Sequence, residues 1–104
     1  MQYTFLPNIA NSDDIPADGI LSRTVYSDDT VKVVLFGFAA GEELSEHTAS
    51  MPAMIHLLHS EAHITLGDDV FEGQAGTWIH MPANLPHSVR AKTPLAMVLL
   101  MLKN

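Results

Sequence analysis

Hydrophobic and polar residues alternate in short runs along this chain, and turn residues separate the runs. Residues 22–27 alternate before a turn at residues 28–29, and residues 30–38 are rich in β-branched and aromatic side chains. Residues 61–66 alternate strictly, and residues 67–69 supply hairpin chemistry after them. Such runs are typical of strands, and no segment combines an apolar stripe at helical period with helix caps. The pattern predicts an all-β fold, a sandwich or barrel of many short strands.

Two runs, residues 53–58 and 95–102, are apolar on both faces apart from His56. One face of such a strand can fill a barrel, but the other would then contact water. Burial against a second copy is the simplest solution, so we expect a homodimer with these strands, or an N-terminal extended arm, at its interface. The alternative is that the chain's own arm covers this face in a monomer. A turn-rich segment, residues 11–19, separates the arm from the main body.

Composition narrows the class of protein. A chain of 104 residues is the size of one domain, and we expect a single domain over residues 1–104 with its core barrel at about residues 22–102. The net charge of −7 argues against nucleic-acid or membrane-surface partners. The absence of cysteine excludes disulfides and thiolate chemistry. No secretory signal or apolar run of membrane-spanning length is present, so we expect a cytoplasmic protein.

Two segments place a histidine at a fixed distance after a glycine. Five residues separate Gly41 from His47, and five separate Gly76 from Pro82, which His87 follows five positions later. The second spacing indicates a strand that runs into a tight turn and returns an imidazole over the sheet. Neutral imidazole is the commonest metal ligand in proteins and can transfer protons near neutral pH. His47 and His87 are therefore the candidate metal ligands.

With both segments in view, residues 31–102 resemble the cupin superfamily, specifically its small single-domain members. The glycines and histidines of the two segments match the family's two motifs, and Asn84 stands where the second motif has glycine. Asparagine is the residue that best replaces glycine in a left-handed backbone conformation. The resemblance implies a jelly-roll β-barrel (a double-stranded β-helix), dimers, and a metal site at the mouth of the barrel.

The departures from these motifs fall mainly on metal ligands. The second histidine of the first motif falls on Ala49, and its carboxylate falls among residues 51–54, where no ionisable side chain occurs. Its closing glycine is Ser60, and the asparagine of the second motif is Ala91. Only the two histidines remain of the usual four ligands. Because stable transition-metal sites normally take three or four protein ligands, we expect a divalent transition-metal ion that is bound weakly.

The barrel would place mostly small and apolar residues beside the two histidines. This describes a pocket for a small, partly apolar ligand with imidazoles as polar handles. His56 alternates away from this face, and we expect His59 and His63 to contact solvent. His80 is included because it lies two residues from Trp78 in the strand before the turn. The predicted lining is His47, Ala49, Met51, Ala53, Met54, Trp78 and His80.

Three functions fit these residues, and no catalytic residue is assigned. The first is a metal-dependent enzyme, in which a divalent ion activates oxygen or polarises a carbonyl. The second is a metal-free binding or sensing module, whose histidines hydrogen-bond a small organic ligand. The third is a metal-free isomerase or lyase with a histidine as general base. A purely structural role remains open, in which the two histidines only pin the mouth of the barrel.

Overall fold

The computed structural model describes residues 2–10 and 12–103, so Asn11, where the predicted turn-rich segment begins, lies outside the described residues. A short 3-10 helix, η1 (Ser12–Asp14), follows an extended arm, and no helix of the described residues has the length and apolarity of a membrane span. The strands are β1 (Ile20–Ser27), β2 (Val31–Phe38), β3 (Glu43–His47), β4 (Ala53–His59), β5 (Ala62–Leu66), β6 (Asp69–Gly73), β7 (Trp78–Met81), β8 (His87–Ala91) and β9 (Leu95–Leu102).

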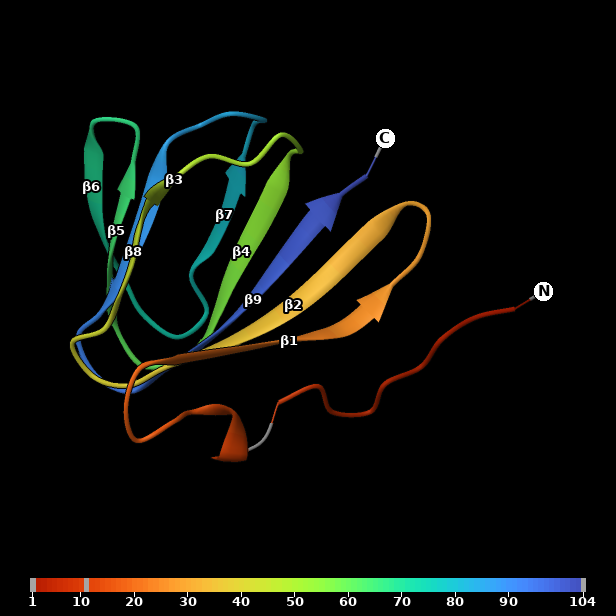
Figure 1. Cartoon of the computed structure of the whole chain (residues 1–104), viewed down its shortest axis with the longest axis horizontal. Helices are drawn as coiled ribbons and strands as arrows, with labels where there is room; N and C mark the ends of the chain where they lie inside the picture. Colours follow the sequence, from red (N-terminus) through yellow and green to blue (C-terminus); the bar gives the residue numbers. More distant parts are fainter. Residues whose placement is uncertain (1, 11, 104) are drawn as a thin grey trace.

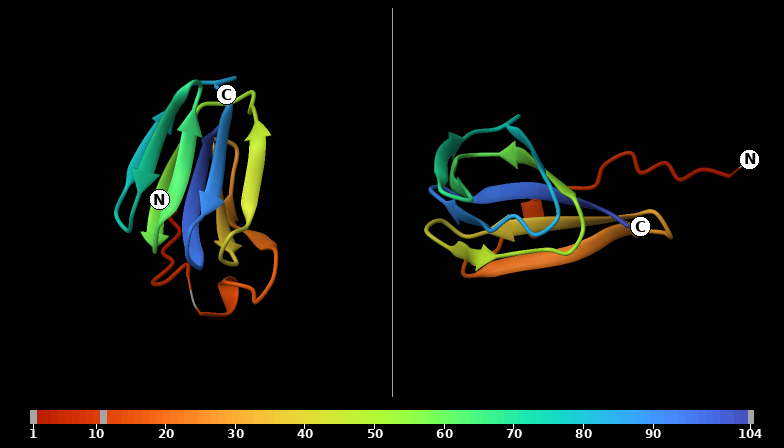
Figure 2. Two further views of the ribbon diagram at one scale, coloured as in Figure 1. Left: turned by 90° about the vertical axis from the view of Figure 1, so that its left-hand side faces the viewer. Right: turned by 90° about the horizontal axis from the view of Figure 1, so that it is seen from above.

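The strands form two antiparallel sheets (Figure 1). One has five strands in the order β1-β2-β9-β4-β7, and the other has four in the order β3-β8-β5-β6. The chain crosses between the sheets after most strands, and the sheets face each other as two layers (Figure 2). This arrangement confirms the all-β, jelly-roll fold that the sequence predicts.

The core lies between the two layers. Residues that alternate inward from both sheets are almost fully buried, as strand geometry requires. The two runs that are apolar on both faces become β4 and β9, which pair with each other in the middle of the five-stranded sheet. The buried cluster comprises Phe38, Ala53, Ile55, Leu57, Ala62, Ile64, Met81, Val89, Ala91, Leu95 and Met97.

The N-terminal segment covers only part of the outer face of the five-stranded sheet. η1 lies against β2 at Gly37, where a Cβ atom would overlap the carbonyl oxygen of Asp14 and lie 3.0 Å from Cα of Ile15. Beside this contact, Leu35 faces outward but is only 1% exposed. Upstream of η1, the arm extends beyond both layers (Figure 2). Glycine at position 37 therefore allows the η1 segment to sit directly on the sheet.

Candidate metal and ligand site

His47 and His87 face each other on neighbouring strands. They are Cα partners where β3 ends and β8 begins. Their ring centroids lie 4.1 Å apart, and the ring planes are tilted by 57°. The structure thus brings together the two histidines that sequence spacing selects, and we refer to them as the His47–His87 pair.

Each ring of the pair is anchored in the same way. Nδ1–H of His47 donates to the carbonyl oxygen of Ser45 at 2.8 Å, and Nδ1–H of His87 donates to that of Leu85 at 2.9 Å. A carbonyl oxygen can only accept, so the proton of each neutral ring is on Nδ1. Both Nε2 atoms then carry lone pairs. Backbone carbonyls orient metal-binding histidines in this manner and fix their tautomer.

The His47–His87 pair is not completely shielded from solvent. His87 is 5% exposed, and His47 is half-buried. Among the described residues, no protein group hydrogen-bonds either Nε2 atom. No buried side-chain nitrogen or oxygen in the same part of the chain lacks a hydrogen-bond partner, so Nε2 of His87 retains access to solvent. Two acceptors on facing rings can thus meet a donor or a metal ion that enters from outside.

Two loops hold the pair at one end of the barrel. The loop of residues 48–52 joins β3 to β4, and the loop of residues 82–86 joins β7 to β8. The backbone N–H of Asn84 donates to the carbonyl oxygen of Ala49 at 2.7 Å, which ties the loops together. Asn84 has a φ of 67°, so asparagine takes the left-handed conformation expected at this position. The N–H of Gly67 also donates to the carbonyl oxygen of Pro86 at 2.8 Å.

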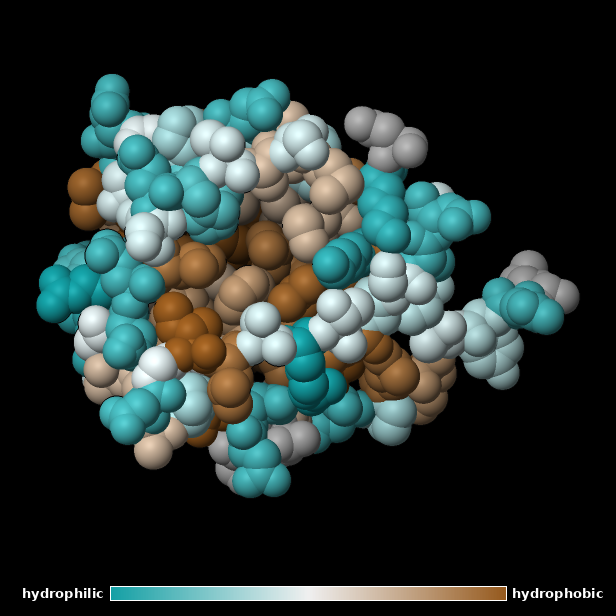
Figure 3. Space-filling model, in the orientation of Figure 1, coloured by the Kyte–Doolittle hydropathy of each residue, from teal (hydrophilic) through white to brown (hydrophobic). Residues whose placement is uncertain are grey.

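Inward-facing side chains form two rows at this end, which we call the mouth. In the four-stranded sheet the row continues from the His47–His87 pair to Leu66, the other Cα partner of His87. In the five-stranded sheet Ala53 has two partners, Met81 on β7 and Met101 on β9. The pair therefore lies opposite mostly apolar side chains. In the view of Figure 3, apolar residues gather between the two sheets, and hydrophilic residues surround them.

One cation extends the second row. Lys32 on β2 is the Cα partner of Met101, which packs against the core, so both positions belong to the inner face of the sheet. Lys32 is half-buried, and among the described residues no carboxylate forms an ion pair with it. The chain carries 12 acidic residues against five basic ones, so an unpaired lysine at this position is a notable feature of the mouth. Sequence reasoning missed it, although Lys32 shares the face of the core residue Phe38.

The other predicted pocket residues separate into distinct places. Ala53 is buried at the mouth, and Ala49 and Met51 are half-buried in the loop after β3. Met54 and His80 instead lie on the outer face of the five-stranded sheet, because they alternate with Ala53 and Met81. This corrects the expectation that Met54 and His80 line the pocket. Strand alternation, which predicted that His56 faces away, places these two residues outward as well.

Trp78 lies at the rim of a cleft of about 300 Å³ between β6 and β7, the edge strands of the two sheets. Trp78 and Phe71 are 59% and 50% exposed, whereas Ile64 at the bottom is buried. Leu66 lines the cleft and is also the cross-strand neighbour of His87. The cleft therefore reaches the row that carries the His47–His87 pair. Its lining is Ile64, Leu66, Phe71, Glu72, Thr77, Trp78 and Ile79.

The two imidazoles are suitable metal ligands, but two protein ligands are fewer than the three or four of a stable site. Two imidazoles that bind one ion through Nε2 at about 2.1 Å hold their ring centroids roughly 4.5–5.3 Å apart. The observed 4.1 Å is shorter, so the two rings would have to move apart to share one ion. No cluster of three or more histidine, cysteine or acidic side chains in the described residues could hold a metal ion. Water or ligand atoms would have to supply the other positions.

Comparisons with known proteins find similar chains among solved structures. No protein-family model matches the chain, and no curated protein matches it. Solved structures do. A conserved protein of unknown function from Streptococcus pyogenes is 26% identical, with 100% of this chain and 96% of that chain covered and a TM-score of 0.82.

Two similar structures carry a family name. A cupin superfamily protein from Desulfitobacterium hafniense DCB-2 is 26% identical, with 100% and 94% of the two chains covered and a TM-score of 0.78. An RmlC-like cupin protein from Desulfovibrio desulfuricans is 25% identical, with 98% and 95% covered and a TM-score of 0.75. The chain is a small protein of the cupin superfamily.

Proposed function

We propose that this protein binds a small, partly apolar molecule with an anionic group at a labile divalent-metal site held by His47 and His87. The observation that carries the proposal is the anchoring of both Nδ1–H groups, which leaves two Nε2 lone pairs for one shared partner. A divalent transition metal is a natural shared partner for neutral imidazoles. When bound, the ion would polarise an oxygen atom of the ligand.

The remaining residues at the mouth favour a ligand of mixed character. The row opposite the pair is apolar: Met81 and Ala53 are buried, and the half-buried thioether of Met101 would suit an apolar body. The half-buried Lys32 at the end of that row would pair with an anion such as a carboxylate. A carboxylate oxygen could also fill a metal position that the protein leaves open. The ligand would then complete the site that two histidines begin.

Metal titration of untagged, chelator-treated protein tests the proposal. For a dissociation constant of about 100 µM, 1 mM metal should stabilise the fold by about 1.4 kcal/mol, which raises Tm by roughly 5–10 °C. We expect a rise in Tm with zinc, cobalt, nickel or manganese and one ion per chain in calorimetry. His87→Asn should abolish the response but keep the fold, since the asparagine amide can still donate to Leu85. His80→Asn, on the outer face, is the matched control and should respond like the wild type.

Equal loss of binding in His87→Asn and His80→Asn would refute the site, as would the absence of any shift with all four metals. The ligand class is tested separately with benzoate and its neutral counterpart benzyl alcohol. Benzoate should raise Tm more than benzyl alcohol, and Lys32→Gln should reduce the difference. Equal effects of the two compounds on the wild type would refute an anionic ligand.

A second candidate is a metal-free binding module, and the absence of a third metal ligand among the described residues favours it. In that case the two Nε2 atoms accept hydrogen bonds from the ligand directly. Benzoate would then stabilise the protein equally before and after chelation. Under the metal-site proposal, chelation should remove most of the stabilisation by benzoate. The same pair of measurements therefore separates the two candidates.

A further inference from the structure

The cleft between β6 and β7 has the features of a second binding site, separate from the His47–His87 pair. It opens between the two sheets, because β6 is the outermost strand of the four-stranded sheet and β7 is the outermost strand of the five-stranded one. Its volume of about 300 Å³ is at the lower end of the range for small-molecule sites. Phe71 lines the β6 side, Trp78 lines the β7 side, and both rings are exposed.

The floor of the β6–β7 cleft is apolar. Ile64 is completely buried at the bottom, and Leu66 and Ile79 are half-buried beside it. Phe71 is the Cα partner of Ile64, so its side chain belongs to the inner face of the four-stranded sheet. Ligand sites typically combine such apolar walls with a few polar groups that select the ligand. The cleft therefore suits a ligand with an apolar body, and nearby charges determine which polar group that body carries.

A carboxylate adjoins the cleft at the end nearest the mouth. Asp69 precedes Phe71 by two positions on β6, so the two side chains share one face of the strand at a spacing of about 7 Å. Asp69 is also the Cα partner of Leu66, which lines the cleft. Among the described residues, no lysine, arginine or histidine forms an ion pair with Asp69. Its carboxylate is therefore available to a ligand.

A second carboxylate, that of Glu72, lies beside the cleft but already has partners. Nδ1 of His63 lies 2.6 Å from one of its oxygens, and Nζ of Lys92 lies 3.6 Å from the other. His63 alternates with the buried Ile64, so this cluster lies on the outer face of the four-stranded sheet. Residues 33–89, which include the whole lining of the cleft, contain no lysine or arginine. The charges around the cleft therefore favour a cation over an anion.

We propose that the β6–β7 cleft binds an organic cation, an ammonium group that carries a short apolar body. The faces of aromatic rings attract cations, tryptophan most strongly, and quaternary ammonium groups are recognised in this way. Trp78 and Phe71 supply the rings, and Asp69 supplies the opposite charge. An anion would instead be repelled by Asp69 and by a chain with a net charge of −7. Binding in the cleft requires no metal ion at the His47–His87 pair.

Intrinsic fluorescence of the full chain tests the proposal, because Trp78 is its only tryptophan. The probe is choline, and its neutral counterpart is the analogue in which a tert-butyl group replaces the trimethylammonium group. At constant ionic strength, choline should change the Trp78 emission saturably and bind at least about fivefold more tightly than the neutral analogue. Asp69→Asn should remove most of this preference. Asp68→Asn is the matched control, since Asp68 is exposed in the turn before β6 and its loss changes the net charge equally.

Far-UV circular dichroism and the urea midpoint establish that each variant folds. Phe71→Leu keeps an apolar side chain but removes the ring, so it should weaken the binding of choline more than that of the neutral analogue. Equal affinities of the wild type for the two compounds would overturn the proposal, as would unchanged emission up to about 100 mM choline. So would equal losses in Asp68→Asn and Asp69→Asn, because net charge alone would then attract the cation. Choline binding should survive chelation of metal ions, and its loss would refute a site independent of the His47–His87 pair.

Discussion

Replacement of Gly37 by alanine tests how the N-terminal segment is held on the sheet. The added methyl group would overlap the backbone carbonyl oxygen of Asp14, and neither group can move away by rotation of a side chain. The η1 segment must therefore withdraw by about 1.5 Å or more to regain ordinary contact distances. Withdrawal exposes Leu35, which is 1% exposed beneath this segment. Full burial of a leucine side chain is worth about 1.5–3 kcal/mol, so partial exposure should cost about 1–2 kcal/mol.

The assay is urea unfolding combined with hydrogen–deuterium exchange of residues 12–18. Gly37→Ala should lower the free energy of unfolding by that amount and accelerate exchange in this segment. Gly41→Ala is the matched control, because Gly41 has a φ of 82° and no atom lies within 4 Å of its added methyl group. It should cost about 1–2 kcal/mol through the left-handed backbone alone and leave exchange in residues 12–18 unchanged.

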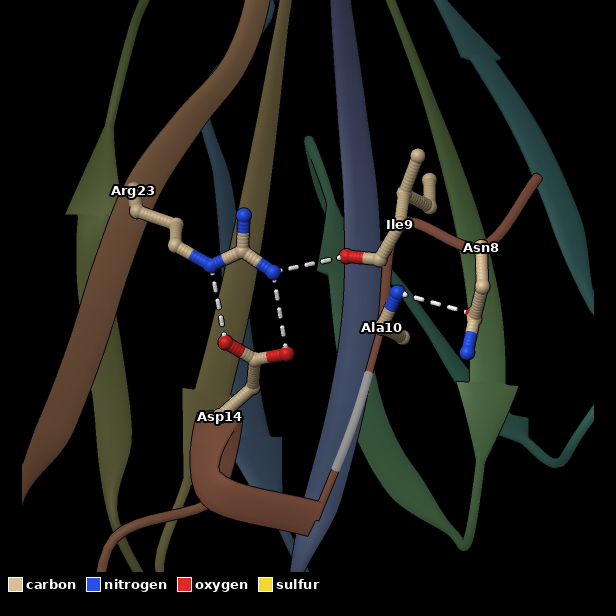
Figure 4. Close-up of polar contacts among 5 residues, drawn as sticks. All are labelled: Asn8, Ile9, Ala10, Asp14 and Arg23. Carbon is tan, nitrogen blue, oxygen red and sulfur yellow. Dashed lines mark hydrogen bonds and ion pairs between the residues drawn. The ribbon is translucent and has the colours of Figure 1, made fainter. Parts of the chain in front are cut away.

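The N-terminal arm should respond differently to the same two variants. The guanidinium of Arg23 on β1 donates to both carboxylate oxygens of Asp14, at 2.9 and 3.2 Å, and to the carbonyl oxygen of Ile9 at 2.9 Å (Figure 4). Displacement of the η1 segment also displaces the base of the arm, so Gly37→Ala should accelerate exchange in residues 2–10 and Gly41→Ala should not. A Gly37→Ala protein with stability within about 0.5 kcal/mol of the wild type and unchanged exchange would show that the segment does not rest on β2. The η1 segment would then not determine the position of the N-terminal arm either.

Further predictions concern the core, a turn and the mouth. Gly73→Ala should lower the free energy of unfolding by about 1–3 kcal/mol through overpacking, since its Cβ would lie 2.6 Å from Leu57 Cδ1. A double-mutant cycle with Leu57→Ala should show a coupling energy of at least about 0.5 kcal/mol. Strictly additive effects of the two substitutions would contradict the overlap. The Tyr26 hydroxyl and neighbouring backbone amides lower the pKa of Asp28, so its contribution is complete above the unfolded pKa of about 3.9 and is lost as pH falls toward the folded value. Asp28→Asn should therefore destabilise the protein near neutral pH by more than near pH 2, and a constant difference in urea midpoint would count against this. Asn84→Ala should cost about 1 kcal/mol more than Asn84→Gly, because residue 84 has a φ of 67°; equal urea midpoints would contradict that strain. Long-range ¹H–¹⁵N NMR at about pH 8.5, where imidazole is neutral, should show both rings of the His47–His87 pair as Nδ1–H tautomers, and an Nε2–H signal from either ring would contradict the carbonyl anchors.

The fold could be predicted because most strands carry a strong apolar pattern. β4 and β9 are apolar on both faces, which predicted them as strands, and they lie among the inner strands of the larger sheet. β3 and β8 had no comparable signal. β3 reads Glu-Leu-Ser-Glu-His and lies at a sheet edge with one apolar residue, and β8 faces the core with His87, Val89 and Ala91. Short strands whose inner residues are small or polar cannot be recognised from the pattern of hydrophobic residues.

The candidate site could be predicted only in part. Motif spacing located the His47–His87 pair, but the state of its rings depends on carbonyl distances that no spacing encodes. The outward positions of Met54 and His80 follow from alternation once the inner face is known. That face could not be read from β2, whose residues 31–38 are apolar on both sides except at Lys32. For the same reason the sequence did not show that Lys32 belongs to the inner face.

Two residues adopt a left-handed backbone conformation where the resemblance expects glycine. Asn84 lies at the mouth with a φ of 67°, and Ser60 follows the opposite end of β4 with a φ of 77°. Such conformations cost free energy for residues other than glycine, so the surrounding structure holds them. At Ala49 and among residues 51–54, where the resemblance expects metal ligands, no ionisable side chain occurs. The backbone carbonyls therefore still orient both imidazoles, and any further metal ligand would have to come from water or from a bound molecule.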